Sequence, residues 1–151
     1  MSNELLNMSL KAIGVVKNEF KQPVRQEWKG IVSEIVVDSR LSEALDGLEA
    51  FSHIIVIYWM HRIADAGQPP TKVRPRGKQD APLVGLFASR APHRPNPVGI
   101  ATVKLLQRQG NILRVEGLDA IDGTPVIDIK PYIPGYDSAA DARVPPWVTK
   151  H

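Results

Sequence analysis

The run FSHIIVIYWM, residues Phe51–Met60, is the most apolar stretch of the chain. It is rich in β-branched and aromatic residues, which favour extended structure. Because the run is short and almost continuously apolar, it predicts a buried central strand. His53 lies inside this strand and is expected to be a hydrogen-bonded core residue. His61 follows the end of the strand, where a side chain is better placed to contact a ligand.

Further strands are predicted on both sides of this run. Their expected ranges are 10–17, 29–38, 83–89, 98–109, 111–120 and 123–132. A turn at Gly110 joins the 98–109 strand to its hairpin partner. In the 29–38 strand, alternate residues from Ile31 to Val37 are expected to share one face. Leucines at 41, 45 and 48 follow helical spacing and predict one helix of about two turns, beginning at Ser39 or Ser42.

Closely spaced strands with little helix between them predict a mainly β fold. We expect a small single-domain β-barrel with long proline-rich loops and one or two short helices. No repeat or change of composition divides residues 1–151, so they are assigned to one domain. Its core is expected over about residues 10–136, followed by an irregular tail at 137–151. No G-x-G-x-x-G motif follows a strand, which argues against a Rossmann enzyme.

The composition narrows the possible chemistry. The 151 residues include no cysteine, so thiolate catalysis, disulfides and zinc–thiolate sites are excluded. None of the four histidines is spaced as a pair of metal ligands, and no metal site is expected. No apolar run reaches the roughly 20 residues of a membrane span, and the N-terminus does not resemble a secretion signal. A cytoplasmic protein is therefore expected.

The segment SRAPHRPNPVG, residues 89–99, combines three prolines with basic and amide side chains. Proline fixes its own φ angle and restricts the residue before it, so the loop is expected to be stiff. The surrounding range 71–96 holds six lysines and arginines against the single acid Asp80. Such a stretch suits an anionic partner. The alternative is a solvated surface connector.

Acidic residues gather in a second segment, DAIDGTPVIDIKP, residues 119–131. Asp119 and Asp122 fall in the turn before a strand, where carboxylates can accept hydrogen bonds from the amine or ribose hydroxyls of a ligand. Asp128 and Lys130 share a face of that strand and could form an ion pair. The alternative is a turn with an ordinary salt bridge.

Three segments together resemble the TsaA-like, or TrmO, family of S-adenosylmethionine-dependent tRNA methyltransferases. They are GLEAFSHIIVIYWMH, GLFASRAPHRPNPVGIATVKL and LDAIDGTPVIDIKPYIP, and the similarity runs from about Ile13 to Tyr136. The resemblance implies a small β-barrel that works as a homodimer, with S-adenosyl-L-methionine near the subunit boundary. It also implies methyl transfer to the N6 nitrogen of an adenosine next to the tRNA anticodon, where the family substrate carries a threonylcarbamoyl group.

The resemblance also implies roles for particular residues. Cofactor contacts are expected at Val24, Arg25, Gln26, His61, Arg62, Arg90, Ile100, Ala101, Asp119, Ala120, Ile121 and Asp122. Either Asp122 or His61 is the candidate acceptor of the departing proton. RNA contacts are expected from Lys72, Arg74, Arg76, His93, Arg94, Asn96 and Lys130. Arg90, beside a strand end, is expected to face the cofactor, whereas Arg94, in mid-loop, is expected to reach outward to RNA phosphate.

Two other functions fit the same residues. One is a non-catalytic barrel that binds S-adenosylmethionine or RNA as a sensor or adaptor, because a loop-decorated barrel with a basic patch serves either purpose. The other is a methyltransferase acting on a small molecule or on a different RNA. Methyl incorporation into RNA separates the enzyme from the sensor.

Overall fold

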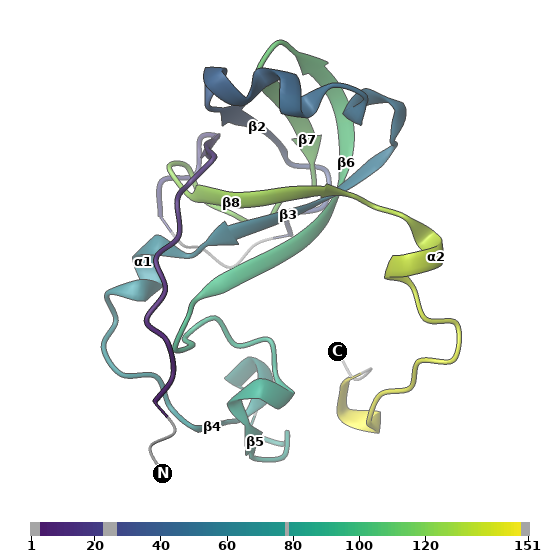
Figure 1. Ribbon diagram of the computed structural model, residues 1–151. Helices are drawn as coiled ribbons and strands as arrows, with labels where there is room; N and C mark the ends of the chain where they lie inside the picture. The colour runs from purple at the N-terminus through teal and green to yellow at the C-terminus, as the bar shows by residue number, and fades with distance from the viewer. Residues whose placement is uncertain (1–3, 23–26, 78, 149–151) are drawn as a thin grey trace.

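The fold is built around a closed antiparallel barrel (Figure 1). The computed structural model describes residues 4–22, 27–77 and 79–148. In spatial order the barrel strands are β1 (Gly14–Lys17), β2 (Val32–Val37), β7 (Ile112–Glu116), β6 (Val98–Gln109), β3 (His53–Trp59) and β8 (Pro125–Pro131). This arrangement confirms the predicted mainly β architecture.

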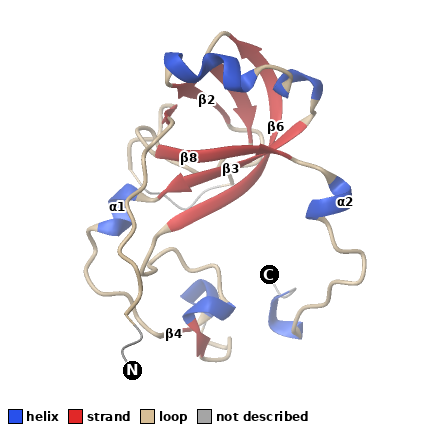
Figure 2. Cartoon of the chain, viewed as in Figure 1, coloured by secondary structure: helices blue, strands red, loops and turns tan. Residues whose placement is uncertain are grey.

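The remaining elements are short and lie outside the barrel wall (Figure 2). Strands β4 (Lys72–Val73) and β5 (Val84–Gly85) form a separate two-stranded sheet. The α-helices are α1 (His61–Ala64) and α2 (Pro134–Asp137), and 3₁₀ turns occur at Ser39–Leu45, Leu48–Ala50, Pro75–Gly77, Leu86–Ala88 and Pro146–Val148. Between α2 and the last of these turns the chain has no regular structure.

The barrel core follows from alternation along the strands. In β2 the buried positions are Ser33, Ile35 and Val37, which share one face as predicted from the sequence. In β3, Ile54, Val56 and Tyr58 are buried, and this strand pairs with β6 on one side and β8 on the other. The prediction of a central strand is therefore confirmed.

The prediction that His53 belongs to the core is wrong. His53 is exposed at the first position of β3, and its Nδ1 lies 2.8 Å from the hydroxyl of Ser52. Successive side chains of a strand point to opposite faces. Because Ile54 faces the core, its neighbour His53 faces away from it.

The helix predicted over the three leucines is also different in the structure. The segment forms two 3₁₀ turns, separated at Gly47, whose φ of 91° is left-handed. Leu45 is buried, whereas Leu41 is 39% exposed. The first turn is capped by Asp38, whose carboxylate accepts a hydrogen bond from the Arg40 backbone nitrogen, rather than by Ser39 or Ser42.

The strand predicted over 83–89 is reduced to the two residues of β5. The chain then turns, because both the backbone nitrogen and the hydroxyl of Ser89 donate to the Leu86 carbonyl, at 3.1 and 2.8 Å. The β6–β7 hairpin does form around Gly110, as predicted. The first strand begins at Gly14, later than predicted, because Leu10 is exposed and the segment before it is irregular.

Gly14 should resist substitution because β1 and β2 approach closely there. A Cβ atom at Gly14 would lie 2.6 Å from the Val36 carbonyl oxygen, which is backbone and cannot rotate away. We expect Gly14→Ala to lower the free energy of unfolding by about 1–3 kcal/mol, measured by urea denaturation. Gly85→Ala is the matched control, since Gly85 has extended backbone and open space around it. Equal losses in both variants would contradict this explanation.

Candidate functional site

A cavity of about 520 Å³ lies at the end of the barrel where β3 ends and β6 begins. Small-molecule sites typically enclose about 300–1,000 Å³. The loop that precedes β8 forms another wall. The lining residues are Trp28, Tyr58, Met60–Ile63, Arg90–Pro92, Arg94, Val98–Ile100, Asp119–Ile121 and Thr124.

The cavity brings together most of the residues expected to contact a cofactor. Those that line it are His61, Arg62, Arg90, Ile100, Asp119, Ala120 and Ile121. Ala101 does not line it and packs against the barrel core instead. The expected contacts at Val24, Arg25 and Gln26 lie outside the described residues.

The floor of the cavity depends on Tyr58 and Gly99, which face each other on β3 and β6. A Cβ atom at Gly99 would lie 2.4 Å from the Tyr58 ring, so the ring occupies the space that a side chain would need. The Tyr58 hydroxyl donates a hydrogen bond of 2.8 Å to the Asp119 carbonyl. Burial, and to a smaller extent the negative charge of Asp119, raise the pKa of Tyr58 to about 12, so the hydroxyl keeps its proton.

Asp119 presents a carboxylate at the cavity wall. Burial of this carboxyl group raises its pKa, and a hydrogen bond with the Trp28 side chain acts in the opposite direction. A carboxylate that is partly shielded from water interacts more strongly with a cationic ligand group than one in bulk solvent. Asp119 is therefore suited to an amine or to hydroxyl donors.

His61 carries a buried nitrogen that no described residue satisfies. Its Nδ1 is shielded from solvent and has no hydrogen-bond partner among the parts of the chain that the structure describes. Leaving such a group unpaired costs about 1–3 kcal/mol. Because His61 also lines the cavity, a ligand in the cavity is a natural partner for this nitrogen.

Arg62 and Arg90, the two arginines expected to contact the cofactor and described in the structure, differ in the hydrogen bonds that they make. Arg62 donates to the side-chain oxygen of Gln22 at 3.0 Å. Arg90 lines the cavity and makes no hydrogen bond with the described residues. A guanidinium group binds carboxylate and phosphate through paired, charge-assisted hydrogen bonds. Arg90 is thus the available anion-binding group of the cavity wall.

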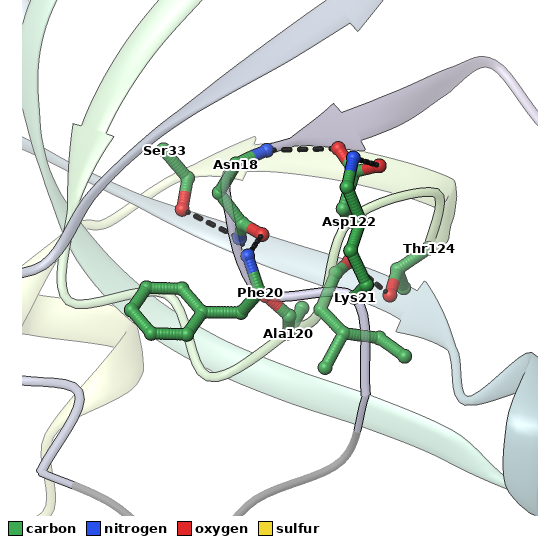
Figure 3. Close-up of polar contacts among 8 residues, drawn as sticks. Asn18, Phe20, Lys21, Ser33, Ala120, Asp122 and Thr124 are labelled. Carbon is green, nitrogen blue, oxygen red and sulfur yellow. Dashed lines mark hydrogen bonds and ion pairs between the residues drawn. The ribbon is translucent and has the colours of Figure 1, made fainter.

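Asp122 is not among the residues that line the cavity, and Figure 3 shows the contacts of its carboxylate. Its carboxylate accepts hydrogen bonds from the Asn18 backbone nitrogen at 3.0 Å and from Lys21 Nζ at 2.7 Å. These two contacts, that of Lys21 first, lower the pKa of Asp122. The role expected for Asp122 at the reacting groups stays a prediction, and in the structure its carboxylate ties the 119–122 loop to the segment after β1.

Arg94 does not reach outward as predicted from its place in the loop. Its guanidinium donates to the Ser89 carbonyl at 3.1 Å and to the Ala91 carbonyl at 2.9 Å, and the side chain is half-buried at the cavity. Its central carbon lies 5.6 Å from the centre of the Phe87 ring. Prolines remove backbone donors from the loop, so its carbonyls are left to accept from this side chain.

The other residues expected to contact RNA lie away from the cavity lining. Lys72, Arg76 and Asn96 are exposed, and Arg74 donates to the Ala81 carbonyl at 2.6 Å. His93 Nε2 lies 2.9 Å from the Gly67 carbonyl. The predicted Asp128–Lys130 ion pair is confirmed at 3.1 Å.

Sequence reasoning missed several residues of the cavity, above all Trp28, Tyr58 and Thr124. Tyr58 could have been found from its place opposite a glycine on the paired strand. That signal can be used only when the register of the two strands is known. Within residues 4–22, 27–77 and 79–148, no cluster of three histidines or acids is arranged to hold a metal ion. Over the same residues, no helix has the length and apolar character needed to cross a membrane.

The chain is similar to proteins named for tRNA methylation and to proteins named for S-adenosyl-L-methionine binding. The sequence model of the tRNA-methyltransferase O N-terminal domain matches residues 14–138. A probable S-adenosyl-L-methionine-binding protein of Methanothermobacter thermautotrophicus is 46% identical over 137 residues, which is 88% of this chain and 96% of that protein. The tRNA (adenine(37)-N6)-methyltransferase of Escherichia coli is 34% identical, over 90% of this chain and 62% of that protein.

The crystal structure of TrmO from Pseudomonas aeruginosa has the same fold. It superposes with a TM-score of 0.74 and 32% sequence identity, over 94% of this chain and 62% of that chain. The chain thus spans nearly the whole archaeal relative but about three fifths of the two bacterial proteins. Since the family match also covers every barrel strand, this chain belongs to the tRNA-methyltransferase O N-terminal domain family.

Proposed function

We propose that this protein binds S-adenosyl-L-methionine in the cavity and methylates the N6 nitrogen of an adenosine next to the tRNA anticodon. The observation that carries the proposal is the set of polar groups that line the cavity: the guanidinium of Arg90, which makes no hydrogen bond with the described residues, the partly buried carboxylate of Asp119, and the buried Nδ1 of His61, which has no partner among them. The family membership and the names of the relatives support the same activity.

The residues of the cavity match the groups of this cofactor. Arg90 can bind its carboxylate, and Asp119 can accept hydrogen bonds from its amine or ribose. Ile100 and Ile121 offer apolar surface for the adenine ring. When bound, the cofactor would supply a methyl carbon on its sulfonium for transfer to the adenine N6 nitrogen, with cleavage of the carbon–sulfur bond and loss of the N6 proton. These residues would hold the cofactor methyl group in line with the N6 nitrogen of the adenosine. Such alignment supplies most of the catalysis that this reaction needs.

His61 is the residue we propose to accept the N6 proton. Its Nδ1 has no partner among the described residues, whereas the carboxylate of Asp122 already accepts two hydrogen bonds. A neutral imidazole nitrogen is a good acceptor near neutral pH. The proton-acceptor role thus falls to the one of the two candidates that lines the cavity.

The substrate we propose is tRNA whose adenosine already carries a threonylcarbamoyl group on N6. The basic range 71–96 borders the cavity through Arg90 and Arg94 and provides positive charge for the phosphate backbone. Because its proposed substrate is tRNA, the protein is proposed to act in the cytoplasm, which fractionation of cells would test.

The decisive experiment is methyl transfer to RNA. We expect purified protein with labelled S-adenosylmethionine to methylate total tRNA from cells that make the threonylcarbamoyl modification, and not tRNA from cells that lack it. Mass spectrometry of the digested nucleosides identifies the product. Cofactor binding without turnover on either tRNA would instead support a sensor or adaptor.

Arg90 and Arg114 provide matched variants for that experiment. Arg90→Ala removes a charged hydrogen bond to the cofactor carboxylate and should weaken cofactor binding by about 1.5–3 kcal/mol in calorimetry. Arg114→Ala removes another exposed arginine, on β7 and outside the cavity lining, and should leave binding unchanged. The proposed carboxylate contact fails if both variants bind alike.

Asp119 should give cofactor binding a dependence on acid pH. The ionised form of Asp119 attracts the cationic cofactor. The affinity for the cofactor should therefore be highest above the raised pKa of Asp119 and should fall as the pH drops through that pKa. The fall should begin at a higher pH than for an ordinary aspartate. Calorimetry from neutral pH to about pH 4 tests this, because Asp119→Asn should flatten the profile. Asp128→Asn, on β8 and outside the cavity lining, should not. A profile unchanged by Asp119→Asn would refute the contact.

We also propose that two copies of the chain form a homodimer. In the apolar run of β3, Ile54, Val56 and Tyr58 belong to the barrel core, and Ile55, Ile57 and Trp59 on the other face are half-buried. Ile100 and Val98, on the contrary, are 55% and 37% exposed at the cavity, and such apolar side chains are commonly covered by a partner. Light scattering should give the mass of two chains at micromolar concentration; the mass of one chain would contradict the proposal.

A further inference from the structure

Phe87 is an aromatic residue that the fold displays rather than buries. Its side chain is 79% exposed, although the preceding Leu86 is only 5% exposed. Both belong to the 3₁₀ turn Leu86–Ala88, which directly precedes the proline-rich loop. An exposed large aromatic ring beside a binding cavity is a feature of interaction sites. The cavity site described above does not use it.

The turn that carries Phe87 is held in place from both sides. The Leu86 backbone nitrogen donates to the Thr71 carbonyl at 2.9 Å, and the Ser89 hydroxyl donates to the Leu86 carbonyl at 2.8 Å. Buried Leu86 anchors the turn against the protein. A ring presented from a fixed turn loses little conformational entropy when it binds a ligand.

Arg94 connects this ring to the cavity. Its guanidinium carbon lies 5.6 Å from the centre of the Phe87 ring, a cation–π contact, and the same side chain lines the cavity. The carbonyls of Ser89 and Ala91 hold the guanidinium in that position. One part of the ring therefore rests on a fixed cation, and the rest remains open to solvent.

The flat ring, its cationic support and the surrounding charge together indicate the class of ligand. Unpaired nucleobases stack on aromatic rings and on guanidinium planes, and lysines and arginines bind the adjoining phosphates. The range 71–96, which includes Phe87, carries six basic residues and one acid. A surface with this much positive charge is poorly suited to bind an apolar surface of a protein partner.

We propose that Phe87, supported by Arg94, is a stacking platform for an unpaired nucleobase next to the adenosine that enters the cavity. The proposal rests on the proposed function, because it assumes that the substrate is RNA. It adds the place where a neighbouring base is held. Arg94 contributes from beneath the ring rather than by reaching out to phosphate, in agreement with its hydrogen bonds to the loop.

The test uses an anticodon stem–loop RNA that carries threonylcarbamoyl-adenosine and has the fluorescent base 2-aminopurine beside it. Binding to the native protein should quench the fluorescence, since stacking quenches 2-aminopurine. Phe87→Ala should abolish the quenching and weaken RNA binding by about 5- to 150-fold, the range expected for one stacked base. Phe87→Trp should restore both, because it restores an aromatic face.

Tyr136 provides the matched control. It is another aromatic residue, 85% exposed, on α2, and Tyr136→Ala should change neither quenching nor RNA affinity. Calorimetry of S-adenosylmethionine and light scattering should give the same results for Phe87→Ala as for the native protein. Unchanged quenching and affinity in Phe87→Ala would overturn the platform, and so would a loss of dimer mass, which would assign the ring to a subunit contact.

Failure of the platform can be told apart from failure of the proposed function. If the native protein methylates the stem–loop and Phe87→Ala does so with unchanged KM, the platform is wrong and the methyltransferase activity stands. If the native protein quenches 2-aminopurine through Phe87 but transfers no methyl group, the platform stands and the activity is wrong. A native protein that does not bind the RNA overturns both.

Discussion

The pairing of β3 along both of its edges is the constraint on which the rest of the structure depends. β3 pairs with β6 from His53 to Trp59 and with β8 from Ile54 to Tyr58. Its buried side chains form the centre of the core. Since both partners are antiparallel to it, the end of β3, the beginning of β6 and the beginning of β8 lie at the same end of the barrel. The segments that line the cavity leave the barrel from that end.

The loop at 119–122 shows how the barrel gives an irregular segment a defined shape. Tyr58 on β3 holds the Asp119 carbonyl from within the barrel. From the other side, the Asn18 side chain donates to the Ala120 carbonyl at 2.8 Å and to the Ser33 hydroxyl at 3.0 Å, as Figure 3 shows. Because it is held at both faces, the loop can place the Asp119 carboxylate at the cavity. The contacts of Asp122 help to hold the loop in this position. Two aspartates three positions apart thus have different tasks and oppositely shifted pKa values.

The strands could be predicted because their burial depends on local alternation, as at Ile35 and Val56. The exposure of His53 could not, because which face of a strand meets the core is decided by its partners in the sheet. The cavity residues with recognisable charge, such as Arg90, were expected, whereas Tyr58 acts through the register that places it opposite Gly99. Arg94 was placed wrongly because its partners are carbonyls of its own loop, whose direction depends on the folded shape.

The proline-rich loop combines two properties that usually oppose each other. It has no regular backbone pairing, yet its side chains must be placed as accurately as those of a strand. Proline restricts the backbone, and the freed carbonyls of Ser89 and Ala91 are then satisfied by Arg94. While its guanidinium donates to these carbonyls, Arg94 also contacts the Phe87 ring and lines the cavity. Arg90, four residues earlier, also lines the cavity but makes no hydrogen bond with the described residues, so its guanidinium is the one we propose for the anionic group of the ligand.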